Sequence, residues 1–397
     1  MLVVTKPRSS VRVITVARII SFSGGAAAYT ALNYVIFQRT HSAVWVSASL
    51  LLTFGVSGLV GPFAGALGDK FDRQKVMIAS DLVAAIFFAA LAFVEAPWLL
   101  LLLAFLGAVG EAPMWSASGA AIPNLVDRED LPWANSMIQL GFNTGLMIGP
   151  AIGGALVAAT GPRWVFVINA ASFVISAGLM ATVRRPFQGE RAEDEEFRGV
   201  RAGILFVLRD RVLRAMTSAW FVWVLGIGLV MVADIPFAEL FDAGSLGYGL
   251  MVTAWGAGSV VGSFAGRLLS ERTEGRALVL GTLCVAVFMG AVAVSPWFWF
   301  VLFGIFASGL GDAFTMVAER NVVQRRTPDA VRSRVMAATE AAISIAFLVS
   351  FLIAGFVVNA VGPRWAYGVG AVGTGLAVLI LLPVLRELRP SETPVSA

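Results

Sequence analysis

Long apolar runs make up most of the chain, and polar or Gly/Pro-rich breaks separate them. A helix needs about 20 consecutive apolar residues to cross a hydrocarbon core about 30 Å thick, and each run is long enough. Cutting at the breaks predicts twelve membrane-spanning helices, at about residues 13–37, 44–67, 76–95, 98–121, 133–158, 164–183, 213–237, 246–269, 276–295, 297–319, 333–359 and 364–385. The predicted fold is an all-α polytopic membrane protein.

A repeat with a constant offset of 201 residues divides the twelve runs into two halves. Its three pairs of blocks are Gly161-Pro-Arg-Trp164 with Gly362-Pro-Arg-Trp365, Gly61-x-Phe-Ala-Gly65-x-Leu67 with Gly262-x-Phe-Ala-Gly266-x-Leu268, and Gly110-Glu-Ala112 with Gly311-Asp-Ala313. An even number of helices in each repeat makes the halves parallel. We therefore expect two pseudo-symmetric six-helix bundles, at residues 1–183 and 213–397, with a short tail after the second.

A polar cytoplasmic linker is predicted between the bundles, at residues 184–212. From Phe197 to Met216, apolar residues interrupted by arginines are typical of an amphipathic helix at the cytoplasmic membrane surface. For the first half of the polar stretch, a plain solvated linker fits equally well.

The basic residues predict the orientation of the chain in the membrane. Of the 29 Lys and Arg, all but Arg39, Arg163 and Arg364 fall on the side of the two termini. Cytoplasmic loops collect Lys and Arg, so we expect both termini in the cytoplasm. The first apolar run is too long for the core of a cleavable signal peptide, and we expect it to remain as a helix.

The composition excludes several classes of function. Only 14% of the residues are charged and 58% are hydrophobic, and the chain has one Cys, Cys284, and one His, His41. It therefore has no intrachain disulfide and no Cys/His zinc site. The net charge of +4 lies in loops between apolar runs, so no nucleic-acid role is assigned. No nucleophile–base pattern or metal or cofactor motif predicts an enzyme.

A loop between the second and third runs carries the first recognisable motif, Gly65-x-x-Gly68-Asp69-Lys70-x-Asp72-Arg73-Gln74-Lys75. It resembles the signature loop of the major facilitator superfamily, although Asp72 and Gln74 depart from the usual Gly and basic residue. The resemblance implies a cytoplasmic gate, for which the candidate residues are Gly65, Asp69, Lys70, Arg73 and Lys75. Ordinary positive-inside topology explains the basic residues but not Asp69.

The fifth run carries a glycine pattern that resembles the antiporter motif of drug exporters in this superfamily, formed by Gly145, Gly149, Pro150, Gly153 and Gly154. Simple packing of helices through small residues is the alternative. Phrases at residues 80–81, 123–126 and 131–136 are similar to the branch with macrolide efflux pumps and enterobactin exporters. This resemblance implies multidrug efflux, antibiotic resistance and a bacterial inner membrane.

Two acids lie midway through predicted membrane helices at equivalent positions of the repeat, Glu111 and Asp312. A charge at mid-bilayer costs about 2.5–3.5 kcal/mol on translocon scales, so an acid there predicts a cavity or a partner. We expect the pair to carry proton coupling or to recognise substrate charge. Neutral, hydrogen-bonded structural acids are the alternative. The motif resemblance also predicts an acid near Gly25 and an arginine on the helix of Glu111, and the chain has neither.

Other polar and aromatic residues complete the candidate sites. Asp81 and Glu340 are predicted to join the cytoplasmic gate, with Gln139, Arg18, Arg320 and Arg334 at a similar depth. Asn33 and Asp234 form another pair at the 201-residue offset, and Asp234 is expected either to line the cavity or merely to end a helix. Trp115, Phe142 and Phe314 are weaker candidates for a cavity that accepts an amphiphilic substrate.

The function predicted from these observations is secondary active export of amphiphilic small molecules by alternating access, in exchange for protons. The expected partners are a small-molecule substrate, lipid and protons, without a cofactor, and the chain is expected to act as a monomer. A proton-independent lipid or metabolite carrier of the same fold is the alternative, followed by a transport-like membrane sensor.

The predicted topology has a direct test. Alkaline phosphatase fused after Gly189 should be inactive, because this enzyme needs the periplasm and the linker is predicted to be cytoplasmic. A fusion after Gly161, beside the outward Arg163, should be active. Activity of the Gly189 fusion would overturn the orientation.

Overall fold

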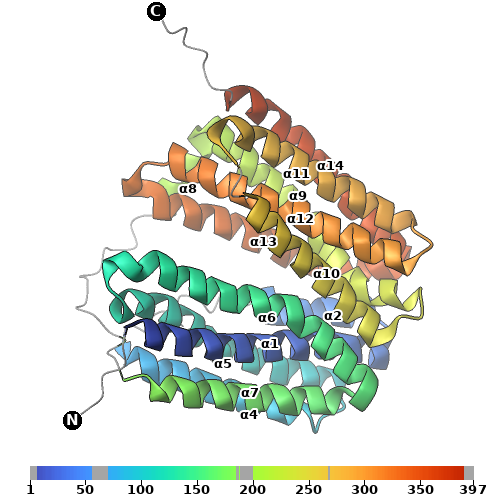
Figure 1. The fold of residues 1–397 in the computed structure, drawn as a ribbon. Coiled ribbons are helices and arrows are strands. Elements are labelled where there is room, and N and C mark those ends of the chain that lie inside the picture. Colours follow the sequence, from blue (N-terminus) through green and yellow to red (C-terminus); the bar gives the residue numbers. More distant parts are fainter. Residues whose placement is uncertain (1–6, 56–69, 185–186, 188–199, 267–268, 389–397) are drawn as a thin grey trace, which may run out of the picture. The chain divides into compact units, whose positions relative to one another are not determined.

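The computed structural model describes residues 7–55, 70–184, 187, 200–266 and 269–388, and every regular element among them is helical (Figure 1). The helices are α1 (Pro7–Thr40), α2 (Ala43–Leu50, continued by a π-helical turn Leu51–Gly55), α4 (Arg73–Leu91), α5 (Pro97–Leu125), α6 (Leu131–Thr160), α7 (Pro162–Thr182), α8 (Val200–Arg209), α9 (Arg211–Glu239), α10 (Gly244–Ala265), α11 (Glu271–Val294), α12 (Phe298–Arg326), α13 (Asp329–Val361) and α14 (Pro363–Glu387). A 3-10 turn, Arg128–Asp130, precedes α6. The prediction of an all-α protein is confirmed.

Ten helices in the described part of the chain are long and apolar enough to cross a membrane. They do not include α10, which matches the run predicted at 246–269, or α2, which matches the start of the run at 44–67. The rest of that second run lies largely outside the described residues. The total of twelve crossings therefore stays a prediction.

Helix boundaries recur at the 201-residue offset seen in the sequence. Helices α5 and α12 begin at residues 97 and 298, and α7 and α14 begin at residues 162 and 363. The sharp connections before α7 and α14 use Gly161 and Gly362, whose φ angles are 83° and 85°. Glycine adopts this left-handed region without steric cost, and the proline that follows each is favoured at the first helical position.

The chain forms two compact units. The first contains Met1–Glu193 and Ile235–Thr253, and the second contains Asp194–Asp234 and Ala254–Ala397. In the first unit, Leu32, Phe88 and Phe173 belong to an apolar core in which they are almost fully buried. In the second, Met216 and Val322 belong to a corresponding core. These units group residues that lie close together in space. The predicted division into bundles at residues 1–183 and 213–397 stays a prediction.

Glycines of the predicted antiporter motif bring α6 against α1. A Cβ atom added at Gly145 would lie 2.5 Å from the Cβ of Phe22, and one at Gly149 would lie 2.7 Å from the Cβ of Ala26. Such distances leave no room for a side chain, so close backbone approach requires glycine here. Gly153 continues the same face one turn later.

The other two residues of the motif face α10 within the same unit. The backbone of Pro150 lies against Gly249, and the hydroxyl of Ser245 donates a hydrogen bond to the Gly154 carbonyl oxygen over 3.0 Å. Nearby, the Ala151 N–H donates to the Thr253 hydroxyl oxygen over 3.0 Å. The motif therefore packs α6 on two neighbours at once.

The amphipathic helix predicted from Phe197 to Met216 is not one continuous helix. It divides at Asp210, whose side chain accepts hydrogen bonds from the N–H groups of Val212 and Leu213, each over 2.9 Å, and so caps the start of α9. Val207 of α8 is buried in a small cluster with Val335 of α13. The apolar face of α8 is thus covered in part by protein, which the sequence pattern alone did not indicate.

Packing at Gly149 predicts a measurable loss of stability. Gly149→Ala should lower the free energy of unfolding by about 1–3 kcal/mol, because the added methyl group overpacks the α1–α6 contact. The matched control is Gly178→Ala on α7, where a Cβ atom meets nothing within 4 Å. Thermal unfolding of the purified proteins compares the two; equal midpoints would show that the close approach does not matter.

Candidate functional site

A buried arginine is the centre of the site in the first unit. Arg18 of α1 is only 3% exposed, and the carboxylates whose charges act on its guanidinium are Asp81 of α4 and Glu111 of α5. Ser176 of α7 neighbours Asp81, which is 1% exposed. A charge inside the membrane needs partners to be tolerated, so each member of this cluster depends on the others.

Several atoms of this cluster lack a hydrogen bond. Within the described residues, the Nε atom of Arg18, both carboxylate oxygens of Asp81 and the hydroxyl of Ser176 are buried and have no hydrogen-bond partner. Unsatisfied buried groups are rare in folded proteins, and each is costly. Charge attraction between the guanidinium and the two acids, together with Ser176 beside Asp81, contributes to holding the cluster together.

Two aromatic rings lie beside the guanidinium, and a third packs against both of them. Phe22 and Trp115 lie with their ring centroids 4.4 Å apart, and Phe142 lies 4.9 Å from Phe22. The Cζ atom of Arg18 is 4.9 Å from the centroid of Trp115 and 5.3 Å from that of Phe22. These distances are within the range of cation–π attraction, so the rings also stabilise the buried positive charge.

Sequence reasoning identified most members of this cluster but not their arrangement. Glu111, Trp115 and Phe142 were predicted to lie near a cavity, whereas Asp81 and Arg18 were placed at a cytoplasmic gate. The structure brings all five together. The superfamily pattern places an arginine on the helix of Glu111, whereas in this chain the arginine near Glu111 is Arg18 of α1. In the sequence, Arg18 is a charged residue within a predicted membrane helix.

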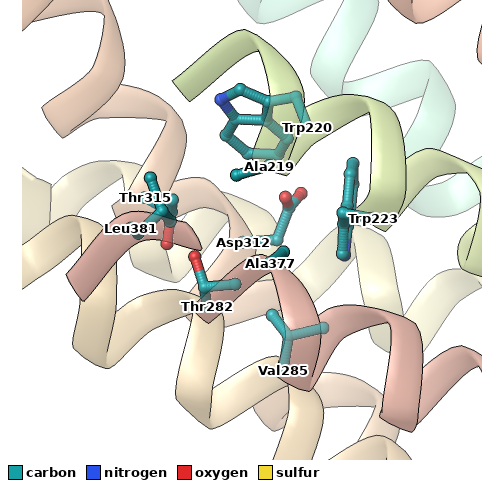
Figure 2. A pocket seen from close by; sticks show the side chains of 9 residues that line it. All are labelled: Ala219, Trp220, Trp223, Thr282, Val285, Asp312, Thr315, Ala377 and Leu381. Atoms are coloured by element: carbon teal, nitrogen blue, oxygen red, sulfur yellow. The ribbon is translucent and has the colours of Figure 1, made fainter. Parts of the chain in front are cut away.

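The site in the second unit is a small cavity beside Asp312 of α12. It is lined by nine residues from α9, α11, α12 and α14, and the Asp312 carboxylate extends toward the indole rings of Trp220 and Trp223 (Figure 2). The space open to the centre of a water molecule is about 10 Å³, which suits one water. The cavity is therefore too small, in this conformation, to hold a whole amphiphilic molecule.

Three of the residues that line this cavity carry side-chain oxygen atoms, although the surface of the cavity is mostly apolar. Asp312 is 7% exposed, and its Oδ1 atom has no hydrogen-bond partner in the described part of the chain. The hydroxyls of Thr282 and Thr315 donate to the carbonyl oxygens four residues earlier, over 2.7 and 2.9 Å. Because their hydrogens are committed, both hydroxyls can only accept a hydrogen bond from a ligand.

Glu319 is an acid of the second unit that the sequence analysis did not identify as a candidate. Glu319 lies seven residues after Asp312 on α12, so the two side chains share a helix face, and the charges of Asp312 and Glu340 both act on it. Glu340 of α13, predicted for the gate, is exposed. Glu319 is followed by Arg320 in the sequence, so the pair resembles the charged residues that commonly end a membrane helix.

The pair predicted from Asn33 and Asp234 makes structural hydrogen bonds. The Ser49 hydroxyl donates to Asn33 over 2.7 Å, and the Tyr367 hydroxyl donates to Asp234. Helix α9 continues through Pro236 to Glu239, so the expectation that Asp234 merely ends a helix is wrong. Phe314, a weaker candidate, packs against the apolar core of the second unit.

The signature loop is only partly described. Gly65 and Asp69 lie outside the described residues, Lys70 and Lys75 are exposed, and Arg73 is partly buried. The two departures from the superfamily pattern have structural roles. Asp72 caps α4 by accepting a hydrogen bond from the Lys75 N–H over 3.0 Å. The Gln74 amide donates to two carbonyl oxygens at the end of α7, over 2.7 and 2.8 Å.

Coupling between Arg18 and its acids has a clear test. Arg18→Ala should destabilise the protein by about 3–5 kcal/mol, because it leaves buried carboxylates without their cation. Combining it with Asp81→Thr, which removes one of those carboxylates, should recover part of the loss. A double-mutant cycle on unfolding free energies measures the coupling; strictly additive losses would contradict the charge cluster.

Comparisons with known proteins agree with this architecture. The family described as transmembrane secretion effector matches residues 8–396. The enterobactin exporter EntS of Shigella flexneri is 25% identical over 409 residues, covering 99% of this chain and 96% of that protein. EntS of Escherichia coli O81 (strain ED1a) is 25% identical over 414 residues, with the same coverage of both proteins.

Solved structures show the same fold at low identity. A bacterial homologue of the human lysosomal transporter Spinster has a TM-score of 0.78 at 14% identity, covering 97% of this chain and 99% of that one. A mutant of the nucleoside transporter NupG has a TM-score of 0.79 at 12% identity, covering 94% and 99%. With apolar helices throughout and a family match over nearly its full length, the chain belongs to the transmembrane secretion effector family of major facilitator superfamily transporters.

Proposed function

We propose that this chain is a proton-driven exporter of amphiphilic small molecules, of the siderophore or drug type, that works by alternating access. The observation that carries the proposal is the pair of acids Glu111 and Asp312. Each lies in a membrane-crossing helix, one beside a buried arginine and the other beside a cavity. The exporter relatives supply the direction of transport, since at 25% identity they match this chain over 99% of its length.

The net charge of the Arg18 cluster suggests how proton binding changes the conformation of the first unit. When ionised, Asp81 and Glu111 carry two negative charges against the one positive charge of Arg18. Binding one proton makes the cluster neutral, and releasing it restores a net negative charge. Because burial makes net charge expensive, the two states should favour different packing around α1, α4 and α5. Such a difference is what couples proton binding to a conformational change.

The proposal also specifies the location of the protein, its gate, its energy source and its partners. The location is a bacterial inner membrane with both termini in the cytoplasm, and the loop with Lys70, Arg73 and Lys75 contributes to a cytoplasmic gate. The proton gradient supplies the energy, so no cofactor is required. The partners are the transported molecule, protons and lipid, and the chain acts as a monomer without nucleic acid. Multidrug efflux and antibiotic resistance are the expected phenotypes for a drug-like substrate.

Variants of the two acids test the proposal. In inside-out vesicles energised to make the interior acidic, the wild-type protein should accumulate substrate, and Glu111→Gln and Asp312→Asn should each reduce the initial rate at least tenfold. The panel of substrates includes enterobactin, a macrolide, a tetracycline and a cationic dye. The control is Glu387→Gln, which removes an acid at the end of α14 and should leave transport unchanged.

Two outcomes would decide against the proposal. Full pH-dependent transport by both variants would show that the acids are structural. Transport by the wild type that does not change when the gradient is collapsed would favour the proton-independent carrier. Size-exclusion profiles of the purified variants establish that any loss of transport is not a loss of folding.

A further inference from the structure

Trp115 of α5 contacts both signs of charge in the Arg18 cluster. Its indole N–H is a hydrogen-bond donor to the carboxylate of Glu111, which lies four residues earlier on the same helix. The Cζ atom of Arg18 lies 4.9 Å from the centroid of its ring. A change in the position of this one side chain therefore acts on an acid and on the cation together.

Rings from two other helices hold the Trp115 indole in place. The centroid of Phe22 of α1 is 4.4 Å away, with the two planes at 69°, and that of Phe142 of α6 is 5.8 Å away, with the planes at 77°. These are edge-to-face arrangements, which aromatic pairs favour. The residue is nevertheless 43% exposed. One part of the indole thus contacts the charges and the rings, and another part is open to a ligand.

Polar residues of α6 lie beside this exposed part. Gln139 precedes Phe142 by three residues, so the two share a helix face, and it is exposed. Its Nε2 atom donates a hydrogen bond to the Oδ1 atom of Asn143 over 2.9 Å. An exposed pair of amides is costly against lipid, because hydrocarbon offers their remaining polar atoms no hydrogen bond. This surface is therefore suited to water or to a transported molecule.

The belt of tryptophans at a membrane surface is the alternative explanation for an exposed indole. Trp98, at the start of α5 and 61% exposed, fits that explanation. A tryptophan of the belt keeps its polar edge at the level of the headgroups. Trp115 instead directs its N–H to Glu111. Its polar edge therefore serves the charge cluster.

We propose that Trp115 is the residue through which the transported molecule acts on the Arg18 cluster: a planar aromatic group of that molecule stacks on the exposed part of the indole. The amides of Gln139 and Asn143 offer hydrogen bonds to its polar substituents. This inference rests on the proposed export function and specifies the substrate class as molecules with a planar aromatic group. Trp115 is then a substrate contact and a positioning residue for Glu111.

The hydrogen bond to Glu111 gives the coupling its direction. An N–H group that donates to a carboxylate favours the ionised form of that carboxylate. A ring stacked on the indole holds the N–H toward Glu111, so binding of the molecule promotes release of a proton. By linkage, the molecule binds more tightly when Glu111 is ionised. Substrate and proton then oppose each other, as exchange requires.

Other charged groups near Glu111 come from two helices. They are Arg18 and Tyr29 of α1 and Asp81 of α4. Helix α6, which also packs on α5, has no ionisable side chain. Trp115→Phe leaves all of these groups in place and keeps an aromatic ring, so it removes the N–H donor alone.

Binding of a planar aromatic probe to the purified full-length protein in lipid nanodiscs tests the proposal. The probe is tritiated phenanthridine, which is uncharged between pH 6 and pH 8, and empty nanodiscs measure its partition into lipid. We expect saturable binding that unlabelled phenanthridine displaces and that cyclododecanol, an apolar ring without aromaticity, does not. The affinity should be about fivefold higher at pH 8 than at pH 6, because the ionised carboxylate accepts the indole N–H.

Three variants locate the response. Trp115→Phe should bind phenanthridine with the same affinity at both pH values, because the ring remains and the donor is gone. Trp115→Leu should weaken binding at least tenfold. Trp98→Leu, which removes another exposed tryptophan of the same helix, should bind as the wild type does. If Trp115→Leu does not fold, the conservative Trp115→Phe decides alone.

The proposal has clear contrary outcomes. An absence of saturable binding to the wild type, an unchanged affinity in folded Trp115→Leu, or a pH dependence that persists in Trp115→Phe would each refute it. Because binding is measured without a gradient, it is independent of proton-driven export. Intact proton-driven export with any of these outcomes would reject this inference alone, and the expected binding without such export would reject the proposed function alone.

Discussion

The charge of Arg18 is the constraint on which the first unit depends. A guanidinium in the interior of an apolar helix bundle is tolerated only with compensating groups, and its acidic partners come from α4 and α5. Ser176 of α7 lies beside one of them, Asp81. The aromatic rings of Phe22 and Trp115 complete the shell. One buried charge of α1 thus interacts with acids of two further helices, α4 and α5.

Close packing by glycine allows this arrangement. A Cβ atom at Gly141 of α6 would already lie 3.4 Å from the Cβ of Arg18 and 3.3 Å from the carbonyl oxygen of Thr15. The glycines at residues 145, 149 and 153 continue that contact along α1. The predicted antiporter motif therefore acts, within this unit, as a packing surface that covers the arginine helix, which agrees with the simpler of the two readings of its sequence.

Much of the fold could be predicted from the sequence because lipid imposes a strong pattern. Apolar runs located the membrane helices, and the Gly-Pro-Arg-Trp repeat located the turns at Gly161 and Gly362 with matching φ angles. Glu111 and Asp312 stood out because acids are rare in such runs. The break at Asp210 and the roles of Asp72 and Gln74 were less accessible, since a cap depends on backbone geometry that charge patterns do not reveal.

The candidate site was harder to predict because its partners are far apart in the sequence. Nothing near Glu111 indicated that its cation lies on α1, and Glu319 was hidden in a charged helix end. The cavity beside Asp312 is lined by residues of four helices that are far apart in the sequence, so only the three-dimensional structure brings them together.

The central claim, that substrate export is exchanged for protons, predicts a proton movement that substrate alone can drive. Purified protein would be placed in liposomes that contain a pH-sensitive dye and start without a pH gradient, and an outward or inward gradient of enterobactin or an amine-bearing macrolide would then be applied. The account predicts a change in internal pH whose direction reverses with the substrate gradient and that is absent in empty liposomes. Substrate movement with no change in internal pH would contradict it.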